Sequence, residues 1–313
     1  MLDRACVIDE QFIKRVKNRE LPEAKSALTL VDAGIAKKTA IEIFDSQIKS
    51  RQLDLIARQL KEKGLSYYTI GSSGHEGNAV FAQVFRYNDM AFLHYRSGAF
   101  YVQRCKQIQK CDPVHDVLLS LVASAEDPIA GGRHKVFGSV PLYVPPQTST
   151  IASHLPKALG TALSITRAKE LNLDSILPKD AVILCSFGDA SVNHATAQTT
   201  FNACSWITRQ GYPLPILFIC EDNGLGISVP TPNDWIEKTL KIRPHLHYIA
   251  CDGLNIADCY AKAQEALYLT RVKKQPVFLH MRCVRMLGHA GSDIESQYRS
   301  LFEIEQTERD DPL

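Results

Sequence analysis

The sequence contains no uninterrupted stretch of about 18 apolar residues, the length that a helix needs to span a bilayer. Residues 1–6 also lack the apolar segment of a secretory signal. The formal net charge of the 313 residues is only +2, so we expect no strong attraction to nucleic acid or to a membrane surface. These absences favour a protein of the cytoplasm, or of the mitochondrial matrix in a eukaryote.

Paired cysteine motifs are absent as well. Nine cysteines occur at irregular spacings, and no Cys-x-x-Cys pair occurs among them. In a chain of this length, that pattern predicts reduced and mostly buried thiols in a reducing compartment. Hydrophobic residues make up 45% of the chain and charged residues 22%, an ordinary globular composition that argues against disorder of the whole chain.

Three continuous apolar runs indicate buried strands at residues 181–187, 215–220 and 276–281. Helical patterns lie between them, at residues 195–208 and 256–267. Continuous apolar strands suit a parallel sheet that is covered on both faces. The alternation of strands and helices is that of a doubly wound fold. We therefore predict an α/β protein with a mostly parallel sheet and helices on both faces.

The chain before these strands is less regular. Residues 31–65 predict a helix, because apolar residues recur on one face among arginines and lysines. Residues 1–30 give a weak signal and are expected to form a loosely packed arm. We therefore divide the chain into an N-terminal helical arm, residues 1–65, and an α/β domain, residues 66–313.

Polar residues follow two of the predicted strands. Asp189 follows the first strand, and Asn223 and Leu225 follow the second. Ligands of such sheets bind at the carboxyl ends of the strands, and oxygen donors of this kind suit Mg²⁺ bound to phosphate. The helix after Ala190 would present its positive end to the same anion. The alternative is two ordinary turns, where Asp, Asn and Gly are common.

The residues around these turns resemble a known family. Gly188-Asp189-Ala190 followed by Asp222-Asn223 resembles the thiamine diphosphate motif, and the similarity extends from about residue 65 to about residue 305. Over this span the chain looks like the alpha subunit of the decarboxylating component of 2-oxo acid dehydrogenase complexes. Residues 223–231 are similar to the branched-chain type, and residues 288–293 resemble the family's Gly-His-Ser-x-Ser-Asp loop.

The resemblance implies a site for thiamine diphosphate and Mg²⁺. Asp189, Asn223 and the backbone carbonyl of Leu225 would hold the metal, and His289 would be the catalytic histidine. The residues implied to contact the cofactor are Tyr95, Arg96, Ser149, Ile151, Gly188, Ala190, Ser191 and His289. Ile151 would be the apolar wedge beneath the cofactor; plain core packing is the other interpretation of this residue, and the two roles are compatible. A K⁺ site is implied at Thr148, Thr150, Ser153 and His154, where His154 replaces a glutamine.

The implied reaction is oxidative decarboxylation of a branched-chain 2-oxo acid, with transfer of the acyl group to a lipoyl-bearing acyltransferase. In the family, a glutamate that activates the cofactor ring comes from a beta subunit or a fused beta domain, and we find no candidate for it here. We therefore expect this chain to bind one end of the cofactor within an alpha–beta heterotetramer. The family continues with helices beyond Leu313, so we expect a truncated end or a fused beta region.

Three alternatives remain open. The alpha subunit of a pyruvate or acetoin dehydrogenase would share these motifs. A non-catalytic assembly protein with a decayed thiamine site is favoured by Ala190, which stands where the family has glycine, and is opposed by Tyr95, Arg96 and His289. A nicotinamide-binding domain is the weakest alternative, because no Gly-x-Gly-x-x-Gly turn follows the first strand.

Overall fold

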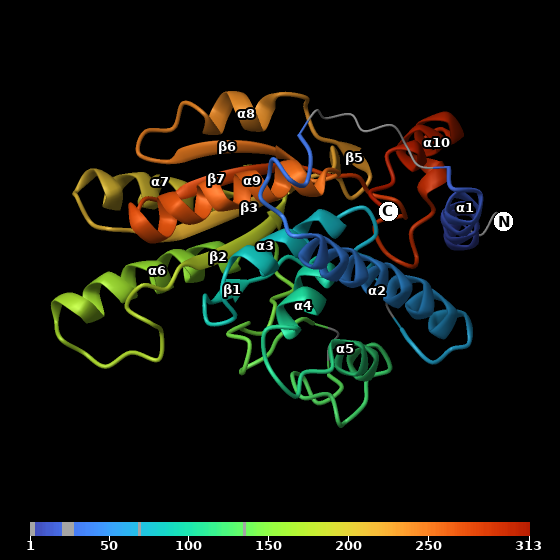
Figure 1. Cartoon of the computed structure of the whole chain (residues 1–313), viewed down its shortest axis with the longest axis horizontal. Helices are drawn as coiled ribbons and strands as arrows, with labels where there is room; N and C mark the ends of the chain where they lie inside the picture. Colours follow the sequence, from blue (N-terminus) through green and yellow to red (C-terminus); the bar gives the residue numbers. More distant parts are fainter. Residues whose placement is uncertain (1–3, 21–27, 68–69, 134–135) are drawn as a thin grey trace.

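The fold is built on one five-stranded sheet in the order β1-β2-β3-β7-β6, and every pair of neighbouring strands is parallel (Figure 1). The computed structural model describes residues 4–20, 28–67, 70–133 and 136–313. The strands are β1 (Ala91–Phe92), β2 (Ile183–Gly188), β3 (Ile216–Asp222), β6 (His247–Asp252) and β7 (Val277–Arg282). A separate antiparallel pair, β4 (Leu225–Gly226) and β5 (Val229–Pro230), follows β3.

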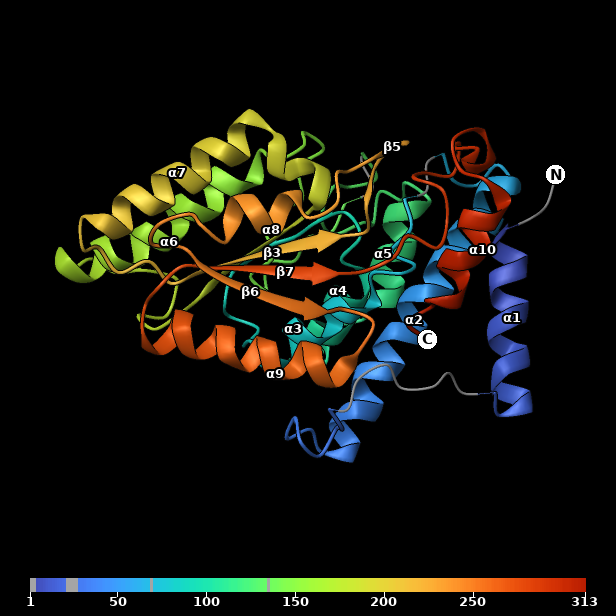
Figure 2. The ribbon, with the colours of Figure 1, turned by 90° about the horizontal axis from the view of Figure 1, so that it is seen from above.

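Helices cover both faces of the sheet. Figure 2 shows α6, α7 and α8 on one side of the strands and α9 with α3 on the other, while α1 and α10 lie beyond the strand ends. The helices are α1 (Arg4–Asn18), α2 (Lys37–Glu62), α3 (Ala79–Val84), α4 (Gly98–Cys105), α5 (Pro113–Leu121), α6 (His154–Glu170), α7 (Ala195–Arg209), α8 (Trp235–Leu240), α9 (Ile256–Leu267) and α10 (Leu301–Arg309), with single turns η1 (Glu76–Asn78), η2 (Asp189–Asn193), η3 (Tyr268–Val272) and η4 (Glu295–Gln297). Within the described segments, no helix is long and apolar enough to cross a membrane.

The central strands are apolar throughout because alternate side chains enter two different cores. Along β3, Leu217 and Ile219 pack into the core beneath α3, α4 and α9. Phe218 and Cys220 pack into the opposite core, beneath α6 and α7. The predicted fold class, a parallel α/β sheet with helices on both faces, is therefore confirmed. The three predicted strands and the two helices between them all lie within two residues of the observed elements.

Residues 4–18 are more ordered than expected. Residues 4–18 form α1, and its buried residue Ile8 packs with Leu55, Met286 and Leu287. The expectation of a loosely packed arm is wrong for this helix. Its contacts come from segments far away in the chain, so its own short apolar face gives little warning of them.

A buried ion-pair network joins the two ends of the described chain. The Arg51 guanidinium in α2 lies 2.8 Å from Glu76 and 2.8 Å from Asp311. Glu76 in turn accepts a hydrogen bond from the backbone N–H of Gly74. The side chain of Arg4 is also paired with Glu308 in α10. The chain after β7 is thus fixed to the turn that precedes α3, which lies beside the site described below.

The cysteines depart from the expectation at one place. Cys105 and Cys111 form a disulfide, so the prediction of reduced thiols is wrong for this pair. The chain curls back after α4 and brings the two Cα atoms to 5.4 Å from each other. A spacing of six residues does not by itself predict this proximity. The other seven cysteines form no disulfide in the described segments, and all of them except Cys6 are buried, as expected.

The aromatic cluster under α7 provides a test of the core. Phe201 is fully buried, and its ring centroid lies 5.3 Å from that of Phe218 and 5.5 Å from that of Phe278. Phe201→Ala should lower the free energy of unfolding by about 3–5 kcal/mol, because it leaves a cavity. Trp206→Ala on the same helix should change it by less than about 0.5 kcal/mol, because Trp206 is 64% exposed. Urea unfolding followed by circular dichroism measures both, and equal losses would contradict the prediction.

Candidate active site

The register of β2 and β3 places two polar turns side by side. Gly188 at the end of β2 is paired with Glu221 near the end of β3. Asp189 follows Gly188 into the turn η2, where its side chain is buried. Its carboxylate accepts a hydrogen bond of 2.6 Å from Thr231 Oγ1, just beyond the β4–β5 hairpin. The hairpin therefore closes over the end of β2.

Asp189 carries a charge that the protein compensates poorly. Burial, and then the neighbouring carboxylate of Asp222, raise the pKa of Asp189 to about 6. Asp222 behaves in the opposite way. Burial alone would raise its pKa, but a hydrogen bond of 2.7 Å from His280 Nε2 brings it below the usual value. A cation beside Asp189 would relieve both its desolvation and its repulsion from Asp222, so the site suits a metal ion.

Asn223 and Leu225 lie in the turn that follows β3. The Asn223 amide nitrogen lies 2.9 Å from His75 Nε2, and its amide oxygen accepts a hydrogen bond of 3.1 Å from the Leu225 N–H. This turn is joined to Asp189 through Thr231, whose backbone N–H donates to the Gly224 carbonyl. Carboxylate, amide and carbonyl oxygens thus gather at one sheet edge. The assignment of a Mg²⁺ ion to them stays a prediction.

Tyr95, Arg96 and His289 come together from two distant loops. Arg96 is almost fully buried and donates to the carbonyl oxygens of Gly71, at 2.6 Å, and His289, at 3.1 Å. The rings of Tyr95 and His289 lie 6.0 Å apart, edge to face. Burial, followed by the charges of Arg96 and Arg285, lowers the pKa of His289 to about 4. The imidazole is therefore neutral near pH 7.

The loop that carries His289 is held by a network that the sequence did not reveal. The backbone N–H of His289 donates to Asp293 Oδ2 at 2.6 Å, and the hydroxyl of Tyr298 donates to the same carboxylate. Arg285 reaches across, donating to Tyr298 at 2.6 Å and to the Ile227 carbonyl at 2.6 Å. The His289 loop and the β4–β5 hairpin are thus tied together. Arg285 lies three residues after the end of β7 and has no local motif that would have identified it.

The segment before α6 lines a small cavity together with the other predicted residues. Tyr95, Thr148, Ile151, His154 and Ser191 all contribute to its wall. Ile151 is 46% exposed, so the core-packing alternative is wrong for this side chain. Ser149 is exposed next to it. The arrangement leaves an apolar side chain available to a bound molecule.

The residues implied to bind K⁺ form hydrogen bonds with one another or with the backbone of the sheet. Thr148 Oγ1 lies 2.7 Å from Ser153 Oγ, which donates to the Thr150 carbonyl. His154 Nε2 lies 2.9 Å from the Ser186 carbonyl, and burial lowers the pKa of His154 to about 4. A neutral imidazole that donates to a backbone carbonyl at Nε2 keeps only Nδ1 for a further partner. The K⁺ site stays a prediction.

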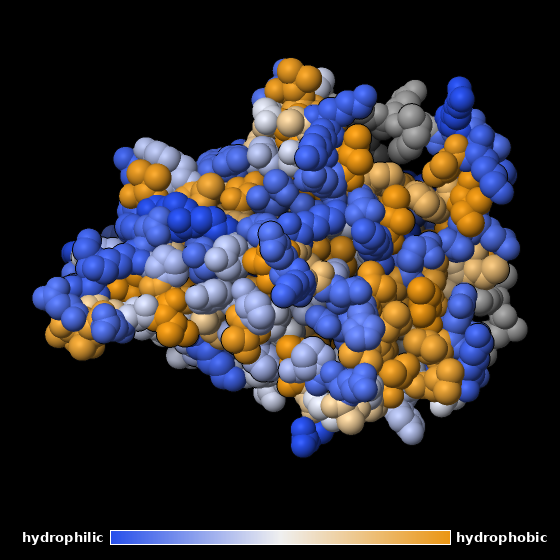
Figure 3. All heavy atoms as spheres, turned by 60° about the horizontal axis from the view of Figure 1, so that its bottom comes forward, coloured by the Kyte–Doolittle hydropathy of each residue, from blue (hydrophilic) through white to orange (hydrophobic). Residues whose placement is uncertain are grey.

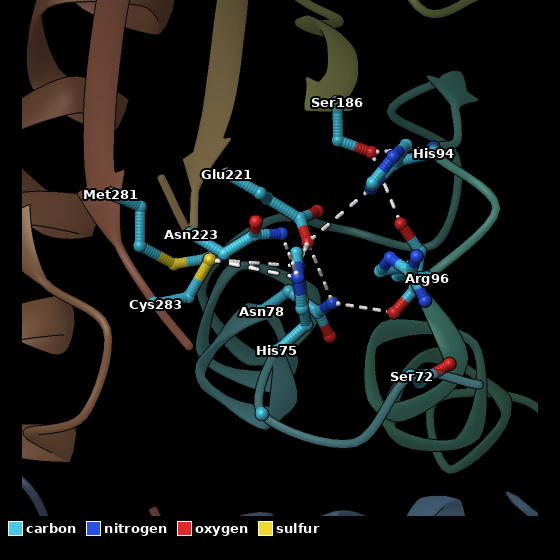
Figure 4. A network of polar contacts seen from close by, with 12 residues as sticks. Ser72, His75, Asn78, His94, Arg96, Ser186, Glu221, Asn223, Met281 and Cys283 are labelled. Carbon is cyan, nitrogen blue, oxygen red and sulfur yellow. Dashed lines mark hydrogen bonds and ion pairs between the residues drawn. The ribbon is translucent and has the colours of Figure 1, made fainter. Parts of the chain in front are cut away.

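The most deeply buried polar cluster of the site was not predicted from the sequence. Glu221 Oε2 lies 2.6 Å from His75 Nδ1 and 3.6 Å from His94 Nδ1 (Figure 4). The three side chains are at most 5% exposed. Burial would raise the pKa of Glu221, but the two imidazoles lower it to about 2. The only indication in the sequence was a glutamate at the end of an apolar strand, and it did not identify the histidines that pair with it.

Ala190 fits its position without strain. It does not have a positive φ, so the change from the family's glycine does not distort the backbone. A Cβ built on Gly226 would lie only 2.8 Å from the Cβ of Ala190. The methyl group of Ala190 therefore fills the space that faces Gly226, and the glycine of β4 allows the hairpin to approach η2.

These features define a class of protein: a parallel α/β fold whose strand ends carry a metal-compatible oxygen cluster beside a buried arginine and a neutral histidine. The model of the family described as "Dehydrogenase E1 component" matches residues 45–313. The chain belongs to the dehydrogenase E1 component family.

Relatives with assigned names agree with this family. The chain is 24% identical over 286 residues to the 2-oxoisovalerate dehydrogenase subunit alpha of Bacillus subtilis, covering 90% of this chain and 81% of that protein. It is 22% identical over 285 residues to the mitochondrial 2-oxoisovalerate dehydrogenase subunit alpha of Mus musculus. That alignment covers 90% of this chain and 60% of the mouse protein, so the chain spans less than two thirds of this relative.

Solved structures support the fold alone. Transketolase from Campylobacter jejuni superposes with a TM-score of 0.53 at 14% identity, covering 79% of this chain and 39% of the transketolase. Transketolase from Leishmania mexicana gives a TM-score of 0.51 at 13% identity, covering 76% of this chain and 36% of the transketolase.

The contact between Ala190 and Gly226 gives a test of the hairpin. Gly226→Ala should destabilise the chain by about 1–3 kcal/mol, because two methyl groups would then overlap. Adding Ala190→Gly should restore most of this loss, since it reopens the space. Gly160→Ala is the matched control: a Cβ there meets nothing within 4 Å, and it should stabilise α6 by about 0.5–1 kcal/mol. Thermal unfolding measures all three, and failure of the double variant to recover would refute the contact.

Proposed function

We propose that this chain is the alpha part of a thiamine diphosphate-dependent 2-oxo acid dehydrogenase. Its reaction is the oxidative decarboxylation of a branched-chain 2-oxo acid, with the acyl group passing to a lipoyl-bearing acyltransferase. The observation that carries the proposal is the undercompensated Asp189 carboxylate beside the Asn223 turn, in a chain of the dehydrogenase E1 component family. The named relatives support the branched-chain substrate.

The chemistry of the donors fits Mg²⁺ and a diphosphate. Asp189, Asn223 and the Leu225 carbonyl offer hard oxygen ligands, and Mg²⁺ in proteins commonly completes its shell with phosphate oxygens. The residues that would surround the diphosphate and the rest of the cofactor are Tyr95, Arg96, Ser149, Ile151, Gly188, Ala190, Ser191 and His289. Thiamine diphosphate, when bound, supplies the electron sink that decarboxylation of a 2-oxo acid requires.

His289 is prepared to donate a hydrogen bond toward the reacting groups. Arg96 Nη2 lies 3.2 Å from His289 Nδ1. A guanidinium can only donate, so Nδ1 must accept and the single ring proton must reside on Nε2. The lowered pKa of His289 keeps the ring in this neutral form. We propose that His289 Nε2–H orients the substrate by donating a hydrogen bond at that atom.

A partner chain completes the site in this proposal. The glutamate that activates the cofactor ring would come from a beta subunit or a fused beta domain, in an alpha–beta heterotetramer. Figure 3 shows apolar side chains gathered over the region of α2 and α5. Ile41, Phe44 and Ile56 of α2 are 36–58% exposed and contribute apolar surface suited to a partner.

Three further points also remain proposals: the K⁺ site, the division of the chain at residue 65, and the compartment, which is the cytoplasm or the mitochondrial matrix.

The cofactor site is tested by calorimetric titration with thiamine diphosphate and Mg²⁺. Asp189→Asn in the chain with its partner should weaken binding by at least about tenfold, because the only charged ligand is lost. Asp174→Asn should bind as the unaltered protein does, because Asp174 is an exposed aspartate away from the site. Equal affinity for both variants, or no binding by the unaltered assembly, would refute the proposed cofactor site.

A substrate test separates the branched-chain proposal from a pyruvate or acetoin dehydrogenase. The same assembly, supplied with an artificial electron acceptor, should turn over 3-methyl-2-oxobutanoate with a higher kcat/KM than pyruvate. A reversed order would assign the chain to the pyruvate type. No turnover of either acid, despite cofactor binding, would favour the non-catalytic alternative.

A further inference from the structure

We propose that His75, His94 and Glu221 form a second metal site, for a divalent transition-metal ion, with Zn²⁺ the ion that this donor set fits best. One donor atom of each side chain lies within 4.8 Å of the other two. The three residues come from separate places: the turn before η1, the loop after β1 and the end of β3. Figure 4 shows the two rings on either side of the glutamate.

Unpartnered atoms distinguish this cluster from an ordinary buried ion pair. Among the described residues, neither ring nitrogen of His94 has a hydrogen-bond partner, and Glu221 Oε1 has none either. Leaving such buried groups unsatisfied costs about 1–3 kcal/mol each. The cluster therefore lacks a partner that could accept an electron pair from one nitrogen of His94 and one from the Glu221 carboxylate. A metal ion has this property.

The distances require only a small rearrangement. With Zn–N and Zn–O bonds of about 2.0–2.1 Å, the donor atoms of a tetrahedral zinc site stand about 3.3 Å apart. Glu221 Oε2 is now 2.6 Å from His75 Nδ1 and 3.6 Å from His94 Nδ1. The first separation has to open by about 0.7 Å and the second has to close by about 0.3 Å. Three protein donors would leave one position free.

The local charge also favours a cation. The Glu221 carboxylate faces both imidazoles, and the carboxylates of Asp189 and Asp222 follow at the ends of β2 and β3. Arg96 and Arg285 oppose these charges. Arg96 is, however, engaged by the Gly71 and His289 carbonyls. Two imidazoles and one carboxylate prefer Zn²⁺ to Mg²⁺, which selects oxygen donors.

The surroundings hold the donors in place. Asn78 donates to Glu221 Oε2 at 3.5 Å and to the Arg96 carbonyl, while the His94 N–H donates to Ser186 Oγ. Asn223 lies against the outer nitrogen of the His75 ring. Such contacts to the outer side of a ligand fix its orientation in metal sites. Ligation of His75 through Nδ1 requires its ring proton to move to Nε2, with no net loss of charge.

The test is a zinc titration of the full chain after removal of metals with EDTA. The unaltered chain should bind one Zn²⁺, and His94→Gln should weaken this binding at least about 100-fold. His247→Gln should bind as the unaltered chain does, because His247 is an exposed histidine on the edge strand β6. Circular dichroism verifies that each variant is folded. Substitution with Co²⁺ gives visible absorption bands that report nitrogen and oxygen ligands without any variant.

Asp189→Asn separates this site from the proposed Mg²⁺ site. Zinc binding should survive Asp189→Asn and a large excess of Mg²⁺, whereas binding of Mg²⁺ and thiamine diphosphate should not survive that substitution. The inference is overturned if the unaltered chain binds no zinc, if His94→Gln binds zinc with unchanged affinity, or if Asp189→Asn abolishes zinc binding. None of these results depends on turnover, so the proposed function can fail or stand independently.

Discussion

The parallel register of β2 and β3 is the constraint on which the site depends. Because both strands run in the same direction, their carboxyl ends meet at one edge of the sheet, and the pairing of Gly188 with Glu221 fixes which residues become neighbours. The turn after β2 delivers Asp189, and the turn after β3 delivers Asn223. β7 continues the pattern and places His280 against Asp222. The hydrogen-bonded pairing of the strands fixes these contacts, so they do not depend on the conformation of a long loop.

This geometry concentrates negative charge in a place with little water, and the protein deals with each carboxylate differently. Asp222 is hydrogen-bonded to His280, which lies on the neighbouring strand. Glu221 is paired with His75 and His94, which lower its pKa to about 2. Asp189 has a threonine hydroxyl and backbone N–H groups but no cationic partner among these contacts, and its pKa is raised to about 6. A bound cation would therefore stabilise Asp189 most, because its carboxylate, beside the hairpin, is the least compensated of the three.

The sequence predicted what depends on local pattern and missed what depends on distant contacts. Continuous apolar runs identified β2, β3 and β7, and turn chemistry after two of them identified Asp189 and Asn223. The short edge strand β1 has only two residues, and β6 is half exposed, so neither carries a strong pattern. The Cys105–Cys111 disulfide depends on how the chain curls after α4. The His75–Glu221 contact spans 146 residues, and no periodicity can encode such a separation.

The two proposed cation sites share no ligand, but a hydrogen bond between Asn223 and His75 connects them. In the structure, His75 Nε2 accepts from the Asn223 amide nitrogen, while Nδ1 faces Glu221. Zinc bound at Nδ1 would leave the ring proton on Nε2, so Asn223 would have to turn its oxygen toward His75. That oxygen is the one assigned to Mg²⁺. If both proposals hold, occupation of the deeper site reorients the Asn223 amide, and the outer site then depends more strongly on Asp189 and the Leu225 carbonyl.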